Sequence, residues 1–312
     1  LFRAKHALVS PLSGTLCDLA VMLAFTEPGE KVAMIPFSAG GFPLGVQKFH
    51  RRLVHLPVNE SSYEVDLNLA QKVIAKERAR LTILGASYIL FPHPVKELSQ
   101  FIRSENLPCL LGYDGSHVLG LIACGEFQDP LREGAEILFG STHKSLYGPQ
   151  GGLILTNSSE HEARLRNFLD IDLETGIGLV DNPHVNRIAA LGIALEELLR
   201  DRGYGGRVVR NAKALARALD DAGVPVRFRQ KDYTESHQIL LDLDAGAAAR
   251  LCRQLEQVDI FIDIAGRLGV AEATRRGMGP TEMAEIAGII SAVHRRGPSA
   301  GLKRRVHRLV KY

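Results

Sequence analysis

The sequence predicts an α/β fold, with a large domain built on a mostly parallel sheet and a small C-terminal α+β domain. Short apolar runs typical of strands alternate with helix-length amphipathic stretches along most of the first 200 of the 312 residues. Several of these runs are apolar almost throughout, which is typical of parallel strands that are buried on both faces. After Pro183 the pattern changes to longer helices rich in Ala, Leu and Glu.

Each expected strand of the large domain is a short apolar run between polar or turn-forming residues. The expected strands are Lys31–Pro36, Leu53–Pro57, Leu81–Leu84, Cys109–Tyr113, Ile137–Ser141 and Gly152–Thr156. The stretches between them carry apolar residues at helical spacing. The expected helices are Leu16–Phe25, Leu67–Glu77, Val95–Glu105 and His161–Leu169. Because helices that connect parallel strands lie on the faces of the sheet, this order predicts helices on both faces.

A glycine-rich break separates the two predicted domains. Val185 to about Leu199 is expected to form one long helix, which Gly203–Gly206 then interrupts. We place the boundary there, with residues 1–203 as the large domain and 204–312 as the small one. The small domain is expected to contain two strands, Val224–Phe228 and Gln238–Asp242. Its expected helices are Val208–Ala222, Ala247–Gln257 and Met283–His294.

The composition is typical of a soluble globular protein and gives no indication of a polyanion binder. Hydrophobic residues make up 46% of the chain. It has 38 basic and 35 acidic side chains, which give a net charge of +3. That charge gives no case for binding nucleic acid. The basic tail, Lys303-Arg304-Arg305 with Arg308 and Lys311, is interpreted as a solvated helical end. An RNA-binding module is the alternative that this tail alone suggests.

No segment predicts a membrane span, a metal site or a disulfide framework. The longest apolar runs, such as Leu19–Phe25, are too short to cross a bilayer, and no signal segment precedes the first element. The cysteines are widely spaced without a C-x-x-C pair, so buried reduced thiols are expected at Cys17, Cys109, Cys124 and Cys252. These observations predict a cytoplasmic protein without a metal. The first residue is Leu rather than Met, which leaves open that further sequence precedes it.

Two polar clusters follow neighbouring strand-like runs. The run Leu110–Tyr113 ends in Asp114-Gly115-Ser116-His117, and the run Ile137–Ser141 ends in Thr142-His143-Lys144. Ligands in open α/β sheets bind at the carboxyl ends of strands. We therefore expect the two clusters to share one site.

This set of side chains is the one that pyridoxal phosphate chemistry needs. The cofactor requires a lysine amine for a Schiff base and a carboxylate that keeps its pyridine nitrogen protonated. Lys144 and Asp114 supply these two groups. The cofactor also needs donors for its phosphate, and Ser13-Gly14-Thr15 lies directly before the predicted helix that begins at Leu16.

Four spaced motifs resemble those of serine hydroxymethyltransferases, within the fold-type-I, aspartate-aminotransferase-like pyridoxal-phosphate enzymes. Ser141–Gly152 resembles the signature T-H-K-(T/S)-x-x-G-P-(R/Q)-G-G, and Asp114–His117 resembles D-x-(A/S)-H. Ser13-Gly14-Thr15, with Pro28-Gly29-Glu30 after the helix, is similar to the phosphate loop S-G-(S/A) and P-G-D. Gly266–Gly269 resembles the segment that carries the arginine for the substrate carboxylate. The match covers most of the chain in order.

The resemblance implies a role for each motif residue around the cofactor. Lys144 forms the Schiff base, Asp114 pairs with the pyridinium nitrogen, and His117 contacts the ring oxygen of the cofactor. Ser141 and His143 shape the lysine pocket. Taken singly, Asp114 is also compatible with a turn former, and the two histidines are compatible with structural roles; the ordered set is what favours the site.

Further residues are assigned through the same resemblance. Ser87, in Gly85-Ala86-Ser87-Tyr88, matches a serine near the cofactor. Arg267 matches the arginine that binds the amino-acid carboxylate, where its planar fork suits a bidentate pair. An ordinary ion pair is the alternative for Arg267, and a simple helix cap is the alternative for Ser13.

The sequence departs from the family pattern in four places. It begins about a dozen residues before the phosphate loop, so a long N-terminal segment with a catalytic glutamate has been lost or the sequence is truncated. Phe42 stands where the family usually has a histidine stacked on the ring, and Gln150 replaces an arginine. The asparagine-rich, folate-binding loop before Arg267 is absent, and Gly176–Pro183 is only loosely similar to the family's phosphate segment.

These departures leave several functions open. The first is a serine-hydroxymethyltransferase-like enzyme that cleaves or forms the Cα–Cβ bond of serine, threonine or glycine, with the use of tetrahydrofolate in doubt. The alternative is a folate-independent threonine aldolase, transaldolase or amino-acid racemase. A degenerate cofactor-binding protein is less favoured, because Lys144, Asp114 and Arg267 are all present. The resemblance also implies a homodimer with shared active sites.

Overall fold

The computed structural model describes residues 1–43, 45–59, 61–171, 174 and 176–310. Its internal contacts divide the chain into two compact units, Leu1–Asp201 and Arg202–Tyr312. We call them the large unit and the small unit and describe each by itself. That the large unit is the cofactor-binding domain stays a prediction.

The large unit is built on a seven-stranded sheet with the order β1-β9-β8-β7-β6-β2-β3. Neighbouring strands from β8 through β7, β6 and β2 to β3 are parallel, whereas β9 is antiparallel to both β8 and β1. The predicted mostly parallel α/β sheet is thus confirmed. The strands are β1 (His6–Leu8), β2 (Lys31–Met34), β3 (Arg52–His55), β6 (Leu81–Leu84), β7 (Leu110–Asp114), β8 (Ile137–Ser141) and β9 (Gly152–Thr156).

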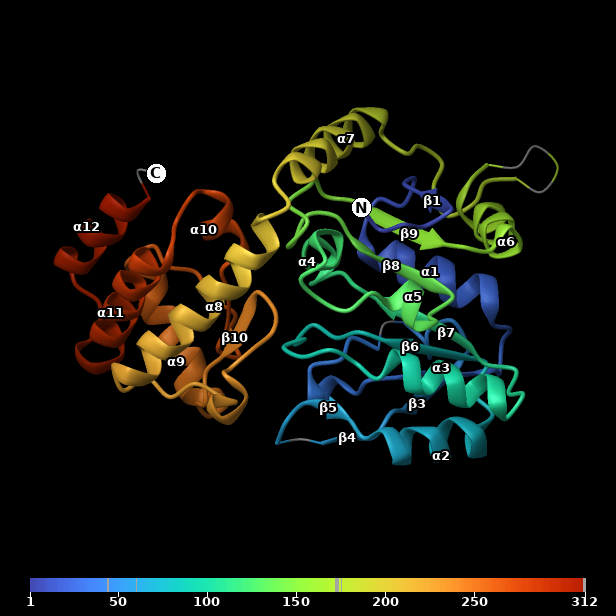
Figure 1. Cartoon of the computed structure of the whole chain (residues 1–312), viewed down its shortest axis with the longest axis horizontal. Helices are drawn as coiled ribbons and strands as arrows, with labels where there is room; N and C mark the ends of the chain where they lie inside the picture. The colour runs from blue at the N-terminus through green and yellow to red at the C-terminus, as the bar shows by residue number, and fades with distance from the viewer. Residues whose placement is uncertain (44, 60, 172–173, 175, 311–312) are drawn as a thin grey trace. The chain divides into compact units, whose positions relative to one another are not determined.

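The central strands are apolar because both of their faces are covered. All five residues of β8 are buried. Its alternate residues Ile137 and Phe139 belong to the hydrophobic cluster that contains much of α1 (Gly14–Phe25). Leu138 points to the opposite face, as alternate residues of a strand do. Figure 1 shows α1 behind the sheet and α3 in front of it.

The helices that follow Ser13 and Asp66 begin at side chains that cap them. Ser13 accepts a hydrogen bond from the backbone N–H of Leu16, and Asp66 accepts one from Leu69. The remaining helices and minor elements of this unit are η1 (Phe37–Ala39), β4 (Val58–Asn59), β5 (Glu64–Val65), α2 (Leu67–Glu77), α3 (Val95–Ser104), α4 (Leu119–Cys124), α5 (Pro130–Glu133), α6 (Ser159–Leu169) and α7 (Val185–Arg200).

The small unit packs helices around a two-stranded antiparallel pair, β10 (Gln238–Leu240) and β11 (Arg267–Gly269). Its helices are α8 (Tyr204–Asp221), η2 (Arg229–Lys231), α9 (Ala245–Glu256), α10 (Ala271–Arg275), α11 (Pro280–Arg296) and α12 (Ala300–Leu309). The basic tail lies in α12, apart from Lys311, which falls outside the described residues.

The predicted strand Val224–Phe228 is wrong. This segment forms only an isolated bridge between Val226 and Leu241. Pro225 has no N–H to donate to a ladder, and Phe228 turns the chain with a left-handed φ of 67°. Apolar content predicted a strand there, but these two residues prevent a continuous one.

Within the described part of the chain, no helix combines the length and the apolar character that crossing a bilayer requires.

Candidate active site

The two polar clusters meet at the carboxyl edge of the sheet because β7 and β8 are parallel neighbours. Asp114 ends β7 and Ser141 ends β8. Ser116 joins the two strand ends: its backbone N–H donates to Oδ1 of Asp114 at 2.8 Å, and its Oγ accepts from the N–H of Ser141 at 2.9 Å. These bonds fix the positions of both clusters relative to each other.

A cavity of about 280 Å³ lies at this edge of the sheet. It brings together every predicted site residue of the large unit, although these residues come from segments that are far apart in the sequence. They are Ser13, Gly14, Thr15, Phe42, Ser87, Asp114, His117, Ser141, His143 and Lys144. Their individual roles stay predictions.

Lys144 follows β8 and is half-buried in the cavity. Its Nζ lies 3.1 Å from Nε2 of His117, within hydrogen-bonding distance. The neighbouring His143 is exposed, yet partial desolvation and the positive charge of Lys144 lower its pKa. A lowered pKa favours a neutral imidazole, which is able to accept a proton.

The carboxylate of Asp114 lies in a poorly solvated position. Burial raises its pKa, while the hydrogen bonds from Ser116 and the charge of Lys144 act in the opposite direction. A carboxylate in such a site is stabilised by a cationic partner inside the cavity. A protonated ring nitrogen is a partner of this kind.

The N-terminus of α1 opens into the same cavity, and it suits an anion. Ser13 is the N-cap, and Gly14 and Thr15 begin the helix, where backbone N–H groups point outward. A Cβ on Gly14 would lie 3.0 Å from the backbone N of Ser141 and 3.1 Å from Oγ of Ser116. Glycine therefore lets the helix start approach the ends of the strands closely.

A tight turn at Gly40-Gly41 carries Phe42 to the cavity. A Cβ on Gly41 would overlap the carbonyl O of Ile35, so only glycine fits there. The carbonyl of Gly40 accepts a hydrogen bond from the N–H of Ser87 at 2.7 Å, which places Ser87 beside the turn. Phe42 remains 42% exposed and offers a ring face for stacking.

Three further residues line the cavity, and none of them had a predicted role there: Asp18, Ser116 and Gln150. Ser116 and Gln150 lie within the predicted motifs, whereas Asp18 lies outside them. Asp18 is 7% exposed and lies on α1. Burial and the charge of Asp114 raise its pKa well above the usual range, while Lys144 lowers it. A signal was present, because Asp18 is the one charged residue in an otherwise apolar helix, GTLCDLAVMLAF.

Arg267, the predicted carboxylate-binding residue, lies on β11 of the small unit. Its Nη2 pairs with Oδ2 of Asp263 at 3.0 Å, and its side chain is 22% exposed. Arg267 is thus held by a carboxylate of its own unit. Its predicted role toward a substrate stays a prediction.

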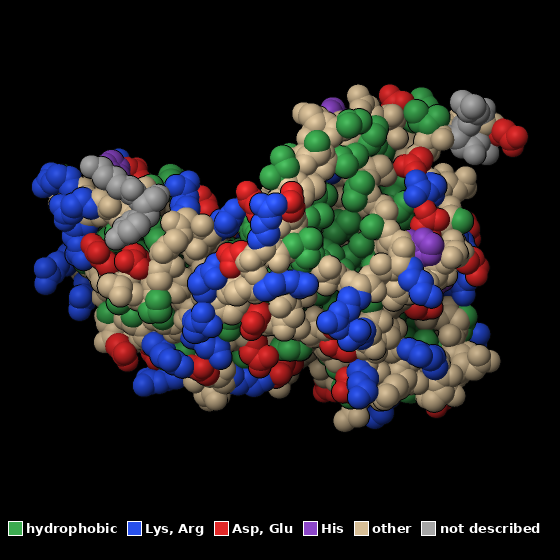
Figure 2. Space-filling model, turned by 45° about the horizontal axis from the view of Figure 1, so that its top comes forward, with side chains coloured by type: hydrophobic (Ala, Val, Ile, Leu, Met, Phe, Trp, Pro, Cys, Tyr) green, Lys and Arg blue, Asp and Glu red, His purple; other side chains and the backbone are tan. Residues whose placement is uncertain are grey.

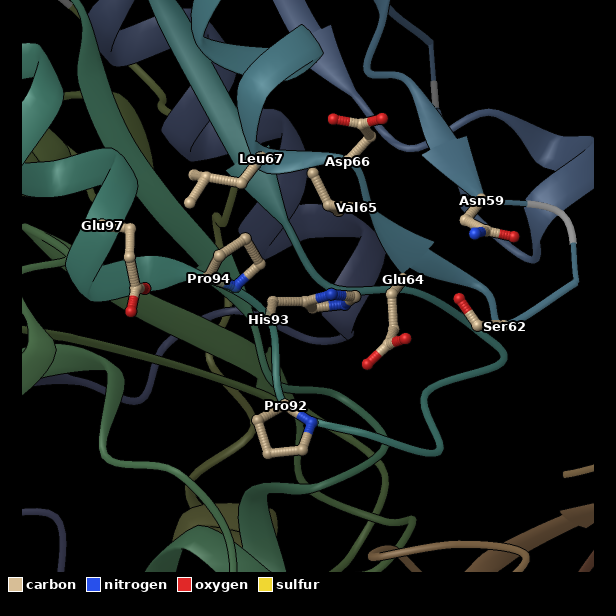
Figure 3. Close-up of a pocket in the computed structure, with 10 residues that line it drawn as sticks. All are labelled: Asn59, Ser62, Glu64, Val65, Asp66, Leu67, Pro92, His93, Pro94 and Glu97. Carbon is tan, nitrogen blue, oxygen red and sulfur yellow. The ribbon is translucent and has the colours of Figure 1, made fainter. Parts of the chain in front are cut away.

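A second cavity, of about 530 Å³, holds none of the predicted site residues (Figure 3). The close-up shows the imidazole of His93 pointing toward Glu64, between Pro92 and Pro94. Asp66 and Glu97 add two more carboxylates to the lining. Its chemistry differs from that of the first cavity, which combines a lysine, two carboxylates and a helix start.

The residues of the first cavity fit pyridoxal phosphate. Lys144 offers an amine, Asp114 offers a carboxylate whose raised pKa calls for a cationic partner, and Ser13 caps a helix start open to an anion. Among the described residues, no group of His, Cys, Asp and Glu is arranged to hold a metal ion.

Comparison with known proteins gives one consistent result. The family model for serine hydroxymethyltransferase matches residues 1–290. The chain is 41% identical over 321 residues to serine hydroxymethyltransferase of Korarchaeum cryptofilum, covering 92% of this chain and 72% of that protein. It is 38% identical over 315 residues to the enzyme of Methanocaldococcus jannaschii, covering 92% of this chain and 71% of that one.

A solved structure agrees with this result. The crystal structure of L-threonine transaldolase from Pseudomonas fluorescens, in its internal aldimine state, superposes with a TM-score of 0.88 at 30% identity. The match covers 99% of this chain and 72% of that one. The predicted fold-type-I architecture and the predicted dependence on pyridoxal phosphate are thereby confirmed. On these matches, the chain belongs to the serine hydroxymethyltransferase family.

Proposed function

We propose that the protein uses pyridoxal phosphate to cleave or form the Cα–Cβ bond of serine, threonine or glycine. One observation carries this proposal: Lys144, Asp114 and the helix start at Ser13 line a single cavity. Family membership alone does not require this, because a degenerate member would not need to keep all three.

The residues of the cavity have distinct tasks in this function. Bound pyridoxal phosphate supplies an electron sink for the bond that breaks at Cα. Lys144 attaches the cofactor through its amine, and the carboxylate of Asp114 keeps the ring nitrogen protonated. His117 lies 3.1 Å from the lysine Nζ, so it is placed to hold or accept a proton there. The N–H groups at the start of α1 bind the phosphate.

Two other residues set the position of the ring and of the substrate. Phe42 stacks on the cofactor ring without offering a proton, since its side chain has no polar atom. Arg267 binds the carboxylate of the amino acid through its guanidinium fork. In this role Arg267 exchanges the carboxylate of Asp263 for that of the substrate.

An absorbance spectrum of the purified protein with pyridoxal phosphate tests this proposal. A visible band that disappears in Lys144→Ala supports attachment at Lys144, and a further red shift with serine, threonine or glycine identifies the substrate. A band of equal strength in Lys144→Ala contradicts the proposal, because the cofactor would then be held elsewhere.

A folate-independent threonine aldolase or transaldolase is the second candidate. Phe42 favours it, because this side chain lines the cavity and offers no hydrogen bond or proton. The short connection from α9, which ends at Glu256, to β11, which begins at Arg267, also favours it. The family's folate-binding loop has no counterpart in so short a segment.

The release of glycine from serine and from threonine, with and without tetrahydrofolate, separates the two candidates. A rate with serine that depends on folate supports hydroxymethyl transfer. Equal rates with and without folate, and faster cleavage of threonine, support the folate-independent reaction.

We also propose a homodimer with shared active sites, as the family resemblance implies. Exposed apolar side chains on α7 support it: Val185 is 71% exposed, Ile193 is 61% exposed and Leu199 is 50% exposed. Figure 2 shows hydrophobic side chains gathered on this face of the molecule. Apolar patches of this kind mark contact surfaces. Sedimentation should therefore give a dimer that Ile193→Asp weakens, and a wild-type monomer would contradict it.

We also propose that the protein is located in the cytoplasm. Cys17, Cys109 and Cys252 are buried free thiols. Thiols persist in reducing compartments, which supports this location.

A further inference from the structure

Asp18 is a buried carboxyl group that the proposed reaction does not use. It lies on α1, one helical turn after Gly14, and lines the same cavity as Asp114 and Lys144. It is 7% exposed. Among the described residues, none donates a hydrogen bond to its side chain. An ionised carboxylate without hydrogen bonds in such a place is strongly disfavoured relative to the neutral acid.

The surroundings of Asp18 decide which carboxyl group carries charge. Asp114 on β7 and Lys144 after β8 are the charged groups that face it. Cys17, its neighbour on α1, is a neutral thiol because burial raises its pKa well above the usual value. His117 and His143 line the cavity as well. Among the described residues, Lys144 is therefore the one positive charge near two carboxyl groups, Asp18 and Asp114. Two carboxyl groups in one site do not both ionise readily, because their negative charges repel.

Hydrogen bonding breaks the symmetry between the two carboxyl groups. Asp114 accepts a hydrogen bond from the N–H of Ser116 at 2.8 Å, and such a bond stabilises the charged form. Asp18 receives no comparable bond from the described residues. A single proton shared by the pair is thus more stable on Asp18, and the negative charge is more stable on Asp114.

We propose that Asp18 is a neutral carboxylic acid in the cofactor cavity and that its O–H donates a hydrogen bond to the bound cofactor. Asp114 is then the one charged carboxylate that faces the ring nitrogen. Asp18 acts as a positioning residue, and this inference rests on the proposed binding of pyridoxal phosphate in the cavity.

Two substitutions separate a neutral acid from a carboxylate. Asp18→Asn keeps the size, the neutrality and a hydrogen-bond donor, whereas Asp18→Leu keeps only the branched outline and removes every polar atom. Glu97→Gln is the matched control, because it removes an exposed carboxylate of α3 that does not line the cofactor cavity. The readouts are the dissociation constant of pyridoxal phosphate and the pH midpoint of its visible band.

A neutral Asp18 predicts no change of the midpoint in Asp18→Asn or in Glu97→Gln. Asp18→Leu should bind the cofactor about tenfold more weakly, as expected for one lost hydrogen bond. If Asp18 is instead charged, Asp18→Asn removes an anion beside the cationic nitrogen at Lys144. The midpoint then falls by about one pH unit or more, and this result would overturn the proposal.

An infrared difference spectrum tests the protonation state of Asp18 in the absence of the cofactor. The spectrum of the cofactor-free Asp18→Asn variant is subtracted from that of the cofactor-free wild type at neutral pH. The difference should show the carbonyl stretch of a protonated carboxylic acid. A carboxylate band in its place overturns the proposal even if cofactor binds as expected. If the wild type shows no visible band that depends on Lys144, the proposed function fails first, and the donor role of Asp18 fails with it.

Discussion

The amine Nζ of Lys144 lies 3.1 Å from Nε2 of His117. Lys144 follows β8, His117 follows β7, and the two strands are parallel neighbours. The lysine is therefore paired with an imidazole nitrogen, which is able to hold or accept a proton, in a cavity that also holds carboxyl groups.

Replacing His117 should slow the reaction more than it weakens the fold. His117→Phe keeps a planar ring and removes the nitrogen that contacts Lys144. Proton transfer by a positioned side chain is worth about 100-fold or more, so kcat should fall by about that factor. Turnover of serine and threonine measures this. A kcat within about twofold of wild type, with thermal stability unchanged, would show that His117 is structural.

Asp114→Asn should separate activity from stability. The variant loses the charge that stabilises a protonated ring nitrogen, and kcat should fall by about 100-fold or more. The cofactor-free protein should be at least as stable as wild type above neutral pH, because burial raises the pKa of Asp114 and makes its charged form costly. Thermal melts and kinetics of the same samples measure both. Loss of stability together with activity would indicate a structural role for Asp114.

Local patterns in the sequence predicted the sheet and its two polar clusters, and the family resemblance predicted the other site residues. The apolar runs that end in Asp114 and Ser141 form β7 and β8 as expected. The alternation of strands and helices indicated their parallel order, and carboxyl ends of parallel strands meet at one edge. The ten residues of the large unit that were predicted from these patterns and from the family resemblance line one cavity.

What the sequence did not predict depends on contacts between distant segments. Asp18 stands out in the sequence as the one charged residue of α1, but its place in the cavity follows only from the packing of α1 beside β7. The edge strand β1 is three residues long and exists through its pairing with β9. Val224–Phe228 has strand-like content, but Pro225 and the left-handed Phe228 interrupt it.

Gly85→Ala should distort the active site directly. Gly85 has a φ of 111°, and a Cβ there would overlap the carbonyl O of Asp114. The backbone at the end of β7 must then shift, at a cost of about 3 kcal/mol or more in unfolding free energy. Gly125→Ala is the matched control: its φ is 77°, but nothing lies within 4 Å of the added Cβ.

The control should lose only about 1 kcal/mol, the cost of a left-handed alanine. Urea unfolding of both variants gives the comparison. Equal losses would mean that the close approach to Asp114 relaxes easily, and the prediction would then be wrong.

Arg267→Lys should change substrate affinity rather than turnover. Lysine keeps the charge but loses the fork that binds a carboxylate at two points, so KM for the amino acid should rise by about tenfold or more. Arg276→Lys is the control, because Arg276 also pairs with a carboxylate four residues away, Glu272. Steady-state kinetics should leave the control unchanged. A wild-type KM in Arg267→Lys would show that Arg267 serves only its pair with Asp263.

The stability of the protein should fall in mild acid because of His93. Burial lowers the pKa of His93 to about 4, against an opposing effect of Glu64. The unfolded chain, with a histidine pKa of about 6.5, binds the proton at a higher pH than the folded chain does. Between the folded and the unfolded pKa of His93, the unfolded state binds more protons than the folded state. The stability that the neutral His93 contributes is therefore fully present above the unfolded pKa and is lost as pH falls toward the folded pKa.

The expected loss from this residue is about 2 kcal/mol between about pH 7 and pH 5. His93→Phe keeps an aromatic ring beside Tyr113, whose ring centroid lies 6.1 Å from that of His93, and removes the titration. Urea unfolding of both proteins at several pH values isolates the effect, because all other titrating groups are shared. The wild type should lose about 2 kcal/mol more than His93→Phe over this interval. Parallel pH profiles would show that His93 accepts its proton in the folded state, and the cavity of Figure 3 would then have to accommodate the charge beside Glu64.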